Sequence, residues 1–312
     1  MSVTMRDAFG QKCAELGKTN KSLVVLDADV SASTKTNYFS KEFPDRFFNC
    51  GVSEANMAGV AAGLAASGFH PVVNAFAIFM ALKCTDQIRN DFCYNMLPVV
   101  FAGAYAGLSD SFDGASHQAI TDTAIMRAMP NMEVIVPADN NQACQALEYA
   151  LTRHNPVYIR LNRNEMPVLP AVSAKDFASG EPIKLRNGYG VTIASNGITA
   201  TMCLEAAELL AKSGIDAEVL SVPFVKPFGS KGLAASVEKT GNLITVEEHN
   251  VMGGFGSACL EHLCKTGINF AYDAVGMQDT FGETGPYVEL MAAYGLSADN
   301  IAKRAKKLAG KK

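Results

Sequence analysis

The chain has 312 residues, of which 48% are hydrophobic and 19% are charged, so it is long and apolar enough for two folded domains and is not intrinsically disordered. Its formal net charge of −4 argues against nucleic acid and anionic membranes as partners, and no apolar run approaches the ~18 residues of a membrane span or secretory signal. The eight cysteines form no CxxC pair, so we expect reduced thiols, no zinc site and a cytoplasmic location.

Short apolar strands alternate with helices along the first part of the chain. The expected strands are 22–27, 70–74, 97–102, 133–136 and 157–160. The expected helices are 55–67, 79–92, 122–128 and 141–153. Uninterrupted apolar strands separated by helices are typical of a parallel sheet that is covered on both faces. We therefore predict a doubly wound α/β domain over residues 1–168.

The segment 169–188 is rich in Pro, Ala, Ser and Gly and has no periodicity, so it is predicted to be a linker. The alternation of strands and helices then restarts. The expected strands are 190–194, 216–222 and 242–247, and the expected helices are 199–213, 231–240, one from about 254, and a basic helix over 300–312. This pattern predicts a second doubly wound α/β domain over residues 189–312.

Glu54 is the first candidate functional residue. Ser53 is a plausible N-cap, which places Glu54 in the first turn of a helix composed largely of Ala and Gly. Such a helix must be buried in a core or an interface, and it carries Glu54 with it. A buried carboxylate needs a partner or takes up a proton. The alternative is a first-turn acid that only complements the helix dipole.

The loop 110–118 is the second candidate. It follows the strand 97–102, in the region where open α/β sheets bind ligands. Asp113 and His117 could converge there on a polyhydroxy substrate, and an ordinary loop with an Asx turn is the alternative. Asp113-Gly114 followed by Asn140-Asn141 imitates a magnesium-binding signature, but the leading Gly is replaced by Phe112. We therefore predict no metal-binding residues in this chain.

Two weaker sequence patterns also indicate anion binding. Ser31 and Ser33 lie in the loop after the first strand, and Arg160 and Arg163 follow a later strand. They could together bind a phosphate, although solvated surface arginines are the alternative. The turn 253–256 (GGFG) is similar to a nucleotide-binding turn, and close packing explains it equally well.

Taken together, these segments resemble the C-terminal half of a transketolase. The segments are GVSEANMAG (51–59), NAFAIF (74–79), DGASHQ (113–118), and MPN followed by VPAD (129–139). Their order and spacing match the family's pyrimidine-binding domain over about residues 5–170. FGETG (281–285) and YGL (294–296) resemble its C-terminal domain.

The resemblance implies roles toward thiamine diphosphate. Glu54 matches the acid that hydrogen-bonds the aminopyrimidine nitrogen and favours the imino tautomer that activates the cofactor. Phe76 and Phe79 match the aromatic wall of the pyrimidine ring. Leu82 stands where transketolases often have Tyr, which weakens that wall, and Asp29 matches an acid near the cofactor.

The resemblance also implies how the substrate binds. Asp113 and His117 match residues that bind substrate hydroxyls, and His117 is also expected to be catalytic. Ser33 and Arg163 match phosphate-binding positions. Tyr105 takes the place of the family's phosphate-binding His, so a branched, shortened or differently charged ketose is an alternative to the usual sugar phosphate.

The family's preceding domain, which binds the diphosphate and Mg²⁺, is not in this sequence. The resemblance therefore implies the second subunit of a split transketolase, which needs a partner subunit to supply the Mg²⁺ site and forms a dimer of heterodimers. The reaction would transfer a two-carbon ketol unit from a phosphorylated ketose to an aldose, as in pentose phosphate metabolism. The alternatives are the beta subunit of a decarboxylating 2-oxoacid dehydrogenase component, a deoxyxylulose-phosphate-synthase-like enzyme, and a catalytically silent scaffold.

Overall fold

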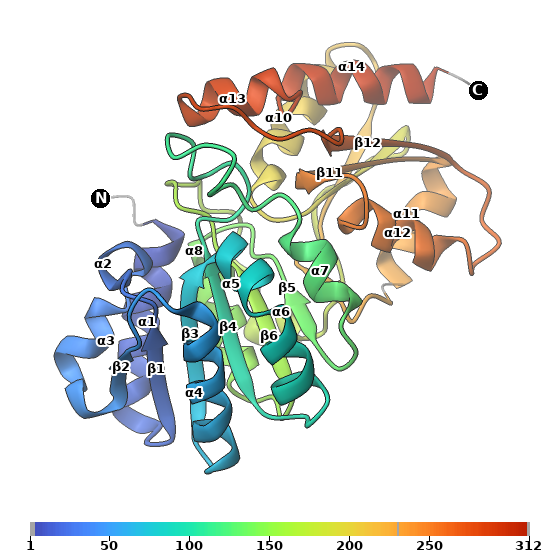
Figure 1. Ribbon diagram of the computed structural model, residues 1–312. Helices are drawn as coiled ribbons and strands as arrows, with labels where there is room; N and C mark the ends of the chain where they lie inside the picture. Colours follow the sequence, from blue (N-terminus) through green and yellow to red (C-terminus); the bar gives the residue numbers. More distant parts are fainter. Residues whose placement is uncertain (1–3, 230, 311–312) are drawn as a thin grey trace.

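The computed structural model describes residues 4–229 and 231–310. It contains two sheets, a seven-stranded sheet in the lower half of Figure 1 and a five-stranded sheet in the upper half. Both are built mainly from parallel strands with helices on either side. The predicted doubly wound α/β fold is confirmed in both halves.

The seven-stranded sheet has the order β10-β5-β6-β4-β3-β1-β2. Its strands are β1 (Leu23–Asp27), β2 (Phe47–Asn49), β3 (His70–Phe76), β4 (Val99–Ala104), β5 (Glu133–Ile135), β6 (Pro156–Arg160) and β10 (Phe224–Lys226). All neighbours pair in parallel except β10, which runs antiparallel to β5. A strand from the second half of the chain therefore closes one edge of the first sheet.

Helices cover both faces of this sheet. They are α1 (Met5–Thr19), α2 (Ser31–Thr34), α3 (Asn37–Glu42), η1 (Pro44–Arg46), α4 (Glu54–Ala66), α5 (Ala77–Lys83), α6 (Thr85–Gln87), η2 (Ile88–Cys93), α7 (Asp122–Ala128) and α8 (Asn140–Ala150). Leu23 and Val25 of β1 belong to the same apolar cluster as α1 and α8, while Val24 and Leu26 belong to the cluster that contains α4. The strand is buried on both faces, which is why its sequence is an unbroken apolar run.

The five-stranded sheet has the order β12-β11-β8-β9-β7. Its strands are β7 (Ile183–Arg186), β8 (Val191–Ser195), β9 (Ala217–Ser221), β11 (Asn242–Asn250) and β12 (Ala271–Met277). Its helices are α10 (Thr199–Ala211), α11 (Lys231–Thr240), α12 (Phe255–Leu263), α13 (Tyr287–Ala293) and α14 (Ala298–Ala309). All pairs are parallel except that of β7 with β9.

Several elements differ from the sequence-based expectation. The helix α1 was not predicted, and the expected helix 79–92 is divided into α5, α6 and the π-helical η2. The segment 169–188, predicted as a linker, contains the short helix α9 (Ala174–Ala178) and the edge strand β7. The last two residues of the predicted helix 300–312 lie outside the described residues.

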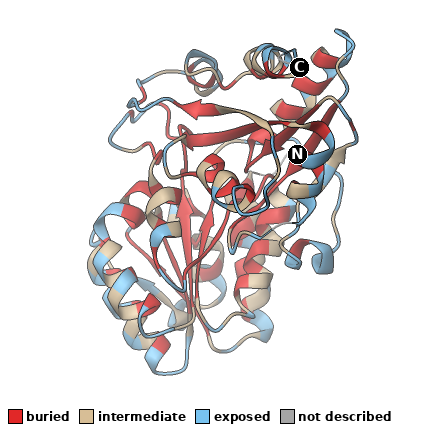
Figure 2. Ribbon diagram, turned by 90° about the vertical axis from the view of Figure 1, so that its right-hand side faces the viewer, coloured by how far each residue is buried: buried red, intermediate tan, exposed pale blue. Residues whose placement is uncertain are grey.

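The two sheets share their core. Two apolar clusters, one on each side, extend from the first sheet into the second, and β10 contributes Phe224 to one and Val225 to the other. Figure 2 shows the strands buried almost throughout, with the exposed residues on helices and loops. Five of the eight free cysteines are buried, and Cys264 is exposed. Among the described residues, no helix is long and apolar enough to cross a membrane.

The strand order places four loops side by side. The strands β6, β4, β3 and β1 are consecutive neighbours, and parallel pairing brings their carboxyl ends to one edge of the sheet. Phe76, the last residue of β3, pairs in register with Ala104, the last residue of β4. Tyr105, Arg163 and Asp29 follow the ends of β4, β6 and β1. The candidate residues therefore gather where open α/β sheets bind ligands.

Candidate active site

Glu54 is buried at the first position of α4, with 6% of its surface exposed. Ser53 occupies the predicted N-cap position, but its side chain makes no capping hydrogen bond. Lys83, the last residue of α5, donates from Nζ to Glu54 Oε1 at 2.8 Å. The carboxylate is therefore compensated by an ammonium group whose own side chain is half exposed.

An aromatic cluster lies beside this ion pair. The rings of Phe76 and Phe79 are stacked with centroids 5.9 Å apart, and the imidazole of His117 meets the Phe79 ring edge-on at 5.1 Å. The Lys83 ammonium lies 4.0 Å from the centroid of the Phe79 ring. A continuous series of contacts thus joins Glu54 to His117, which the sequence places 63 positions apart.

Tyr105 connects the aromatic cluster to two arginines. Its ring stacks on Phe76 at 4.4 Å, and the guanidinium of Arg163 lies 4.8 Å from its centroid. Arg6 donates from Nη1 to the Tyr105 hydroxyl at 2.5 Å and to the main-chain oxygen of Ser33 at 2.8 Å. The two predicted phosphate-binding positions are therefore linked through Arg6 and Tyr105.

Two groups at this end were missed by the sequence analysis. Arg6 lies in α1, and that helix was not predicted; its apolar residues at every fourth position (5, 9 and 13) were the available signal. Asp110 belongs to the singled-out loop but received no role. It is fully buried, and Arg163 donates from Nη1 to its Oδ1 at 2.9 Å. Burial, reinforced by the neighbouring Asp113, raises the pKa of Asp110 to about 6.

The loop 110–118 is held by the C-terminal half of the chain. Gln118 donates from Nε2 to the main-chain oxygen of Glu283 at 2.9 Å. Gly114 has a φ of +74°, and a Cβ there would lie 2.6 Å from Thr284 Oγ1. The loop therefore packs closely on the segment 281–285, which the sequence analysis singled out separately. Asp113 is exposed on this loop, and His117 is half-buried.

Two predicted cofactor residues lie outside these contacts. Asp29 is exposed and accepts a hydrogen bond from Asn49 Nδ2 at 2.8 Å. Leu82 is 58% exposed on α5. Among the described residues, the hydrogen bonds and ring contacts of the site link neither of them to Glu54 or Phe79. Their roles stay predictions.

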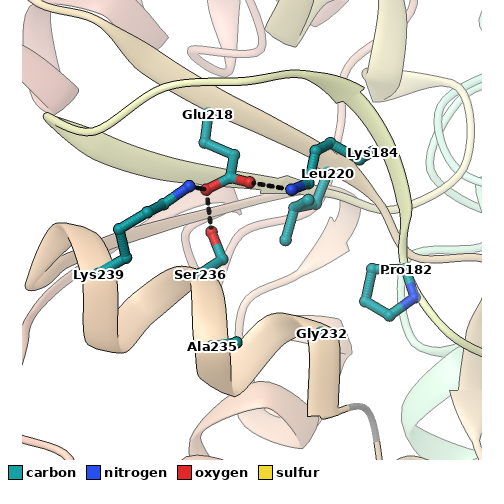
Figure 3. Close-up of a pocket in the computed structure, with 8 residues that line it drawn as sticks. All are labelled: Pro182, Lys184, Glu218, Leu220, Gly232, Ala235, Ser236 and Lys239. Carbon is teal, nitrogen blue, oxygen red and sulfur yellow. Dashed lines mark hydrogen bonds and ion pairs between the residues drawn. The ribbon is translucent and has the colours of Figure 1, made fainter.

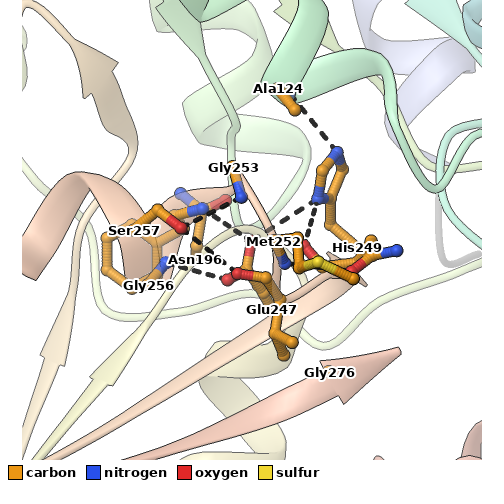
Figure 4. A network of polar contacts seen from close by, with 12 residues as sticks. Ala124, Asn196, Glu247, His249, Met252, Gly253, Gly256, Ser257 and Gly276 are labelled. Atoms are coloured by element: carbon orange, nitrogen blue, oxygen red, sulfur yellow. Dashed lines mark hydrogen bonds and ion pairs between the residues drawn. The ribbon is translucent and has the colours of Figure 1, made fainter. Parts of the chain in front are cut away.

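Two N–H groups of the glycine-rich turn 253–256 are bonded by a carboxylate of the same chain. Phe255 donates its N–H group to the carboxylate of Glu247 at 2.6 Å. Gly256 donates to the same carboxylate at 2.8 Å (Figure 4). A Cβ on Gly254 would lie 2.1 Å from the same carboxylate, so the glycine is needed for close packing. His249, in the same network, accepts the N–H of Ala124 at 3.4 Å and so joins β11 to α7. This turn therefore serves the junction between the two halves of the chain.

A pocket on the C-terminal half has the charged residues of a binding site but uses them internally. Glu218 accepts hydrogen bonds from Lys184 at 3.1 Å, from Ser236 at 2.9 Å and from Lys239 (Figure 3). Burial opposes ionisation of Glu218, but these three bonds together lower its pKa. The carboxylate and both ammonium groups thus satisfy one another.

Comparison with protein families identifies the family to which the chain belongs. Residues 1–168 match the pyrimidine-binding domain of transketolase, and residues 180–301 match the transketolase C-terminal domain. The chain belongs to the transketolase family. It corresponds to the C-terminal half of the family's fold, as its sequence motifs predicted.

Transketolase relatives of similar length cover nearly the whole chain. A putative transketolase C-terminal section from Methanocaldococcus jannaschii is 38% identical and covers 96% of this chain and 94% of its own. A protein from Clostridium sp. named 6-deoxy-6-sulfo-D-fructose transketolase subunit SqwH is also 38% identical, over 99% of this chain and 95% of its own. A solved structure described as a split gene transketolase, inactive beta4 tetramer, has a TM-score of 0.88 and 40% identity, and the match covers 99% of both chains.

Longer relatives match over part of their length. A 1-deoxy-D-xylulose-5-phosphate synthase from Geobacter sulfurreducens is 36% identical, and the match covers 94% of this chain but 46% of that enzyme.

Proposed function

We propose that this chain is the pyrimidine-binding subunit of a two-component, thiamine-diphosphate-dependent transketolase. Its partner would be an N-terminal-half subunit that holds the diphosphate and Mg²⁺, in a cytoplasmic dimer of heterodimers. The contacts that join Glu54, Phe79 and His117 carry this proposal, because they unite a buried carboxylate, a ring wall and an imidazole at one sheet edge. The relatives of matching length, named as a C-terminal section and a split gene product, support the two-component organisation.

The residues present fit the aminopyrimidine ring of this cofactor. Such a ring needs a carboxyl group at a ring nitrogen and an aromatic side chain against its face. The Lys83 ammonium now makes both kinds of contact, since it bonds Glu54 at 2.8 Å and lies 4.0 Å from the Phe79 centroid. A planar heteroaromatic ring in its place would keep both contacts.

Each residue of the site then has a defined task. The cofactor, when bound, would supply a nucleophilic carbon for the transfer of a two-carbon unit from a ketose to an aldose. Glu54 would hold a proton at the ring nitrogen, and Phe76 and Phe79 would exclude water from it. His117, whose imidazole meets the Phe79 ring edge-on, and Asp113 would bind and orient substrate hydroxyls, and His117 would move a proton there.

The positively charged groups near Tyr105 would bind the distal end of the substrate. Arg6 and Arg163 both contact the Tyr105 side chain, and Ser33 accepts a hydrogen bond from Arg6 through its main chain. A phosphorylated ketose is the donor that the family resemblance favours. The relative named for a sulfofructose supports a second candidate, a ketose that ends in a sulfonate.

The direct test is reconstitution with the partner subunit. We expect the complex to transfer a ketol unit from a ketose to an aldose only when thiamine diphosphate, Mg²⁺ and both subunits are present. Turnover of a 2-oxoacid with a lipoyl acceptor, and none of ketoses, would instead support a 2-oxoacid dehydrogenase component. Condensation of pyruvate with an aldose phosphate would support a deoxyxylulose-phosphate synthase, and a complex without any of these activities would be a scaffold.

A further inference from the structure

The distal end of the candidate substrate site contains a buried negative charge beside its arginines. We propose that Asp110 determines the charge of the group bound there, so that the site takes a ketose ending in a singly charged oxyanion, such as a sulfonate, in preference to a doubly charged phosphate. This inference rests on the proposed function, because it assigns a substrate class to the same site.

Arg6 has donors to spare for an oxyanion. Both of its hydrogen bonds, to Tyr105 and to Ser33, use Nη1. Its Nε is buried and has no hydrogen-bond partner among the described residues. A buried donor without a partner is costly, so the Arg6 guanidinium gains by turning toward a tetrahedral oxyanion, whose oxygens accept from several of its N–H groups.

Arg163 is already partly neutralised. Its Nη1 donates to Asp110 Oδ1 at 2.9 Å, and the Asp110 carboxyl has no exposed surface. The Asp110 carboxyl is fully buried while the Arg163 side chain is 37% exposed, so solvent screens the pair only in part and Asp110 offsets part of the attraction that Arg163 exerts on an anion. The other oxygen of Asp110, Oδ2, has no hydrogen-bond donor among the described residues.

The other charged groups around Arg6 and Arg163 do not supply positive charge that would compensate for Asp110. Asp7 faces Arg6 and is itself paired with Lys35 at 3.5 Å. Asp113 lies close enough to Asp110 to affect its ionisation, and it adds a further negative charge at the mouth of the site. Arg6 is thus the main uncompensated cation for the distal group among these residues.

The charge of the ligand decides which group fits. A phosphate monoester carries about −1.5 to −2 at pH 7, because its second pKa is near 6. A sulfonate has the same tetrahedral arrangement of oxygens and a single negative charge throughout this range. One uncompensated guanidinium matches the sulfonate, while the second phosphate charge faces the buried Asp110 carboxylate at close range and is repelled.

The test compares two unreactive ligands that differ in one group, D-glucitol 6-phosphate and 6-deoxy-6-sulfo-D-glucitol. Neither has a carbonyl, so binding to the reconstituted, cofactor-loaded complex can be measured calorimetrically at pH 8 without turnover. We expect the sulfonate to bind about tenfold more tightly than the phosphate. In Asp110→Asn, which removes the negative charge and keeps the shape, the phosphate should gain about tenfold relative to the sulfonate.

Asp86→Asn is the matched control. It makes the same change in net charge at an exposed side chain, which bonds Asn90, and should leave the ratio of the two affinities unchanged. The inference is overturned if the wild-type complex binds the phosphate as tightly as the sulfonate or more tightly, if neither ligand binds, or if a folded Asp110→Asn complex keeps the wild-type ratio. Because the ratio needs no turnover, a complex that transfers no ketol unit counts separately against the proposed function.

Discussion

The Lys83 ammonium lies 2.8 Å from Glu54 Oε1 and thereby neutralises the one buried carboxylate that α4 brings to the sheet edge. The same ammonium rests against the Phe79 ring. In the proposed site an aminopyrimidine ring would need both surfaces, so Lys83 would have to leave Glu54 for the cofactor to bind. The ion pair keeps the carboxylate compensated in the free chain.

The first prediction follows from this exchange. Lys83→Met keeps the length of the side chain but removes its charge, so the cofactor no longer has to displace an ion pair. We expect thiamine diphosphate to bind the reconstituted complex about three- to tenfold more tightly, a modest gain because Lys83 is half exposed. Calorimetric titration with the cofactor measures it.

Lys184→Met provides the control for that experiment. Lys184 also pairs with a buried carboxylate, Glu218, but in the pocket on the C-terminal half. Its loss should leave cofactor affinity unchanged. Weaker cofactor binding in Lys83→Met would mean that the ammonium supports the bound ring instead of yielding to it.

The second prediction concerns the loop that carries Asp113 and His117. Alanine at Gly114 places a Cβ 2.6 Å from Thr284 Oγ1 and forces a φ of +74° that L-residues rarely adopt. We expect Gly114→Ala to lower kcat/KM for the ketose by about tenfold or more through displacement of the loop, with cofactor affinity little changed. Steady-state kinetics and cofactor titration measure the two effects.

Gly214→Ala is the control that separates backbone strain from displacement of the loop 110–118. Gly214 has a φ of +77°, but open space surrounds the added Cβ, and the residue lies just beyond α10. Its alanine variant should lose about 1 kcal/mol of stability and keep its kinetics. Equal kinetic losses in both variants would show that general strain, and not the position of the loop, lowers the activity.

The third prediction concerns pH and the junction between the two halves. Glu248 is buried and accepts hydrogen bonds from Leu108 N at 2.8 Å and from Tyr287 Oη at 2.9 Å. Burial raises its pKa from 4.5 to about 7. The folded state therefore binds more protons than the unfolded state between these values, and the contribution of Glu248 to stability is lost as pH rises through 7.

Glu248→Gln removes this titration. We expect the free energy of unfolding of the wild type, minus that of the variant, to fall by a few kcal/mol between pH 4.5 and 8. Urea unfolding at several pH values measures the difference, and other titrating groups cancel because both proteins contain them. A difference that grew with pH would contradict the raised pKa.

The fold could be predicted from the sequence because burial on both faces leaves an unmistakable pattern. β1 is an unbroken apolar run, and α7 begins and ends at the predicted residues. The edge strand β7 was not predicted, because its residues are mostly half-buried and its apolar and polar residues alternate only weakly. The helix α1 was not predicted, because charged residues lie between its apolar residues at every fourth position and make the pattern hard to recognise.

The site could be predicted only in part. Glu54, Phe76, Phe79 and His117 could be singled out because they belong to recognisable motifs, and the structure brings them to one sheet edge, while their roles stay predictions. Lys83 ends a helix 29 positions from Glu54, and nothing in its local sequence distinguishes it from a solvated lysine. Arg6 bonds Tyr105, and Asp110 pairs with Arg163. These contacts form only in the folded sheet, so the local sequence around Arg6 and Asp110 does not indicate them.

The central claim is that the carboxyl of Glu54 acts on the cofactor ring, and Glu54→Gln tests it because the amide keeps the size of the side chain. The decisive measurement is kcat for ketol transfer by the reconstituted complex at saturating thiamine diphosphate. We predict a loss of about 100-fold or more, with the subunits still assembled and the ketose KM little changed. Turnover within a few fold of the wild type would contradict the account.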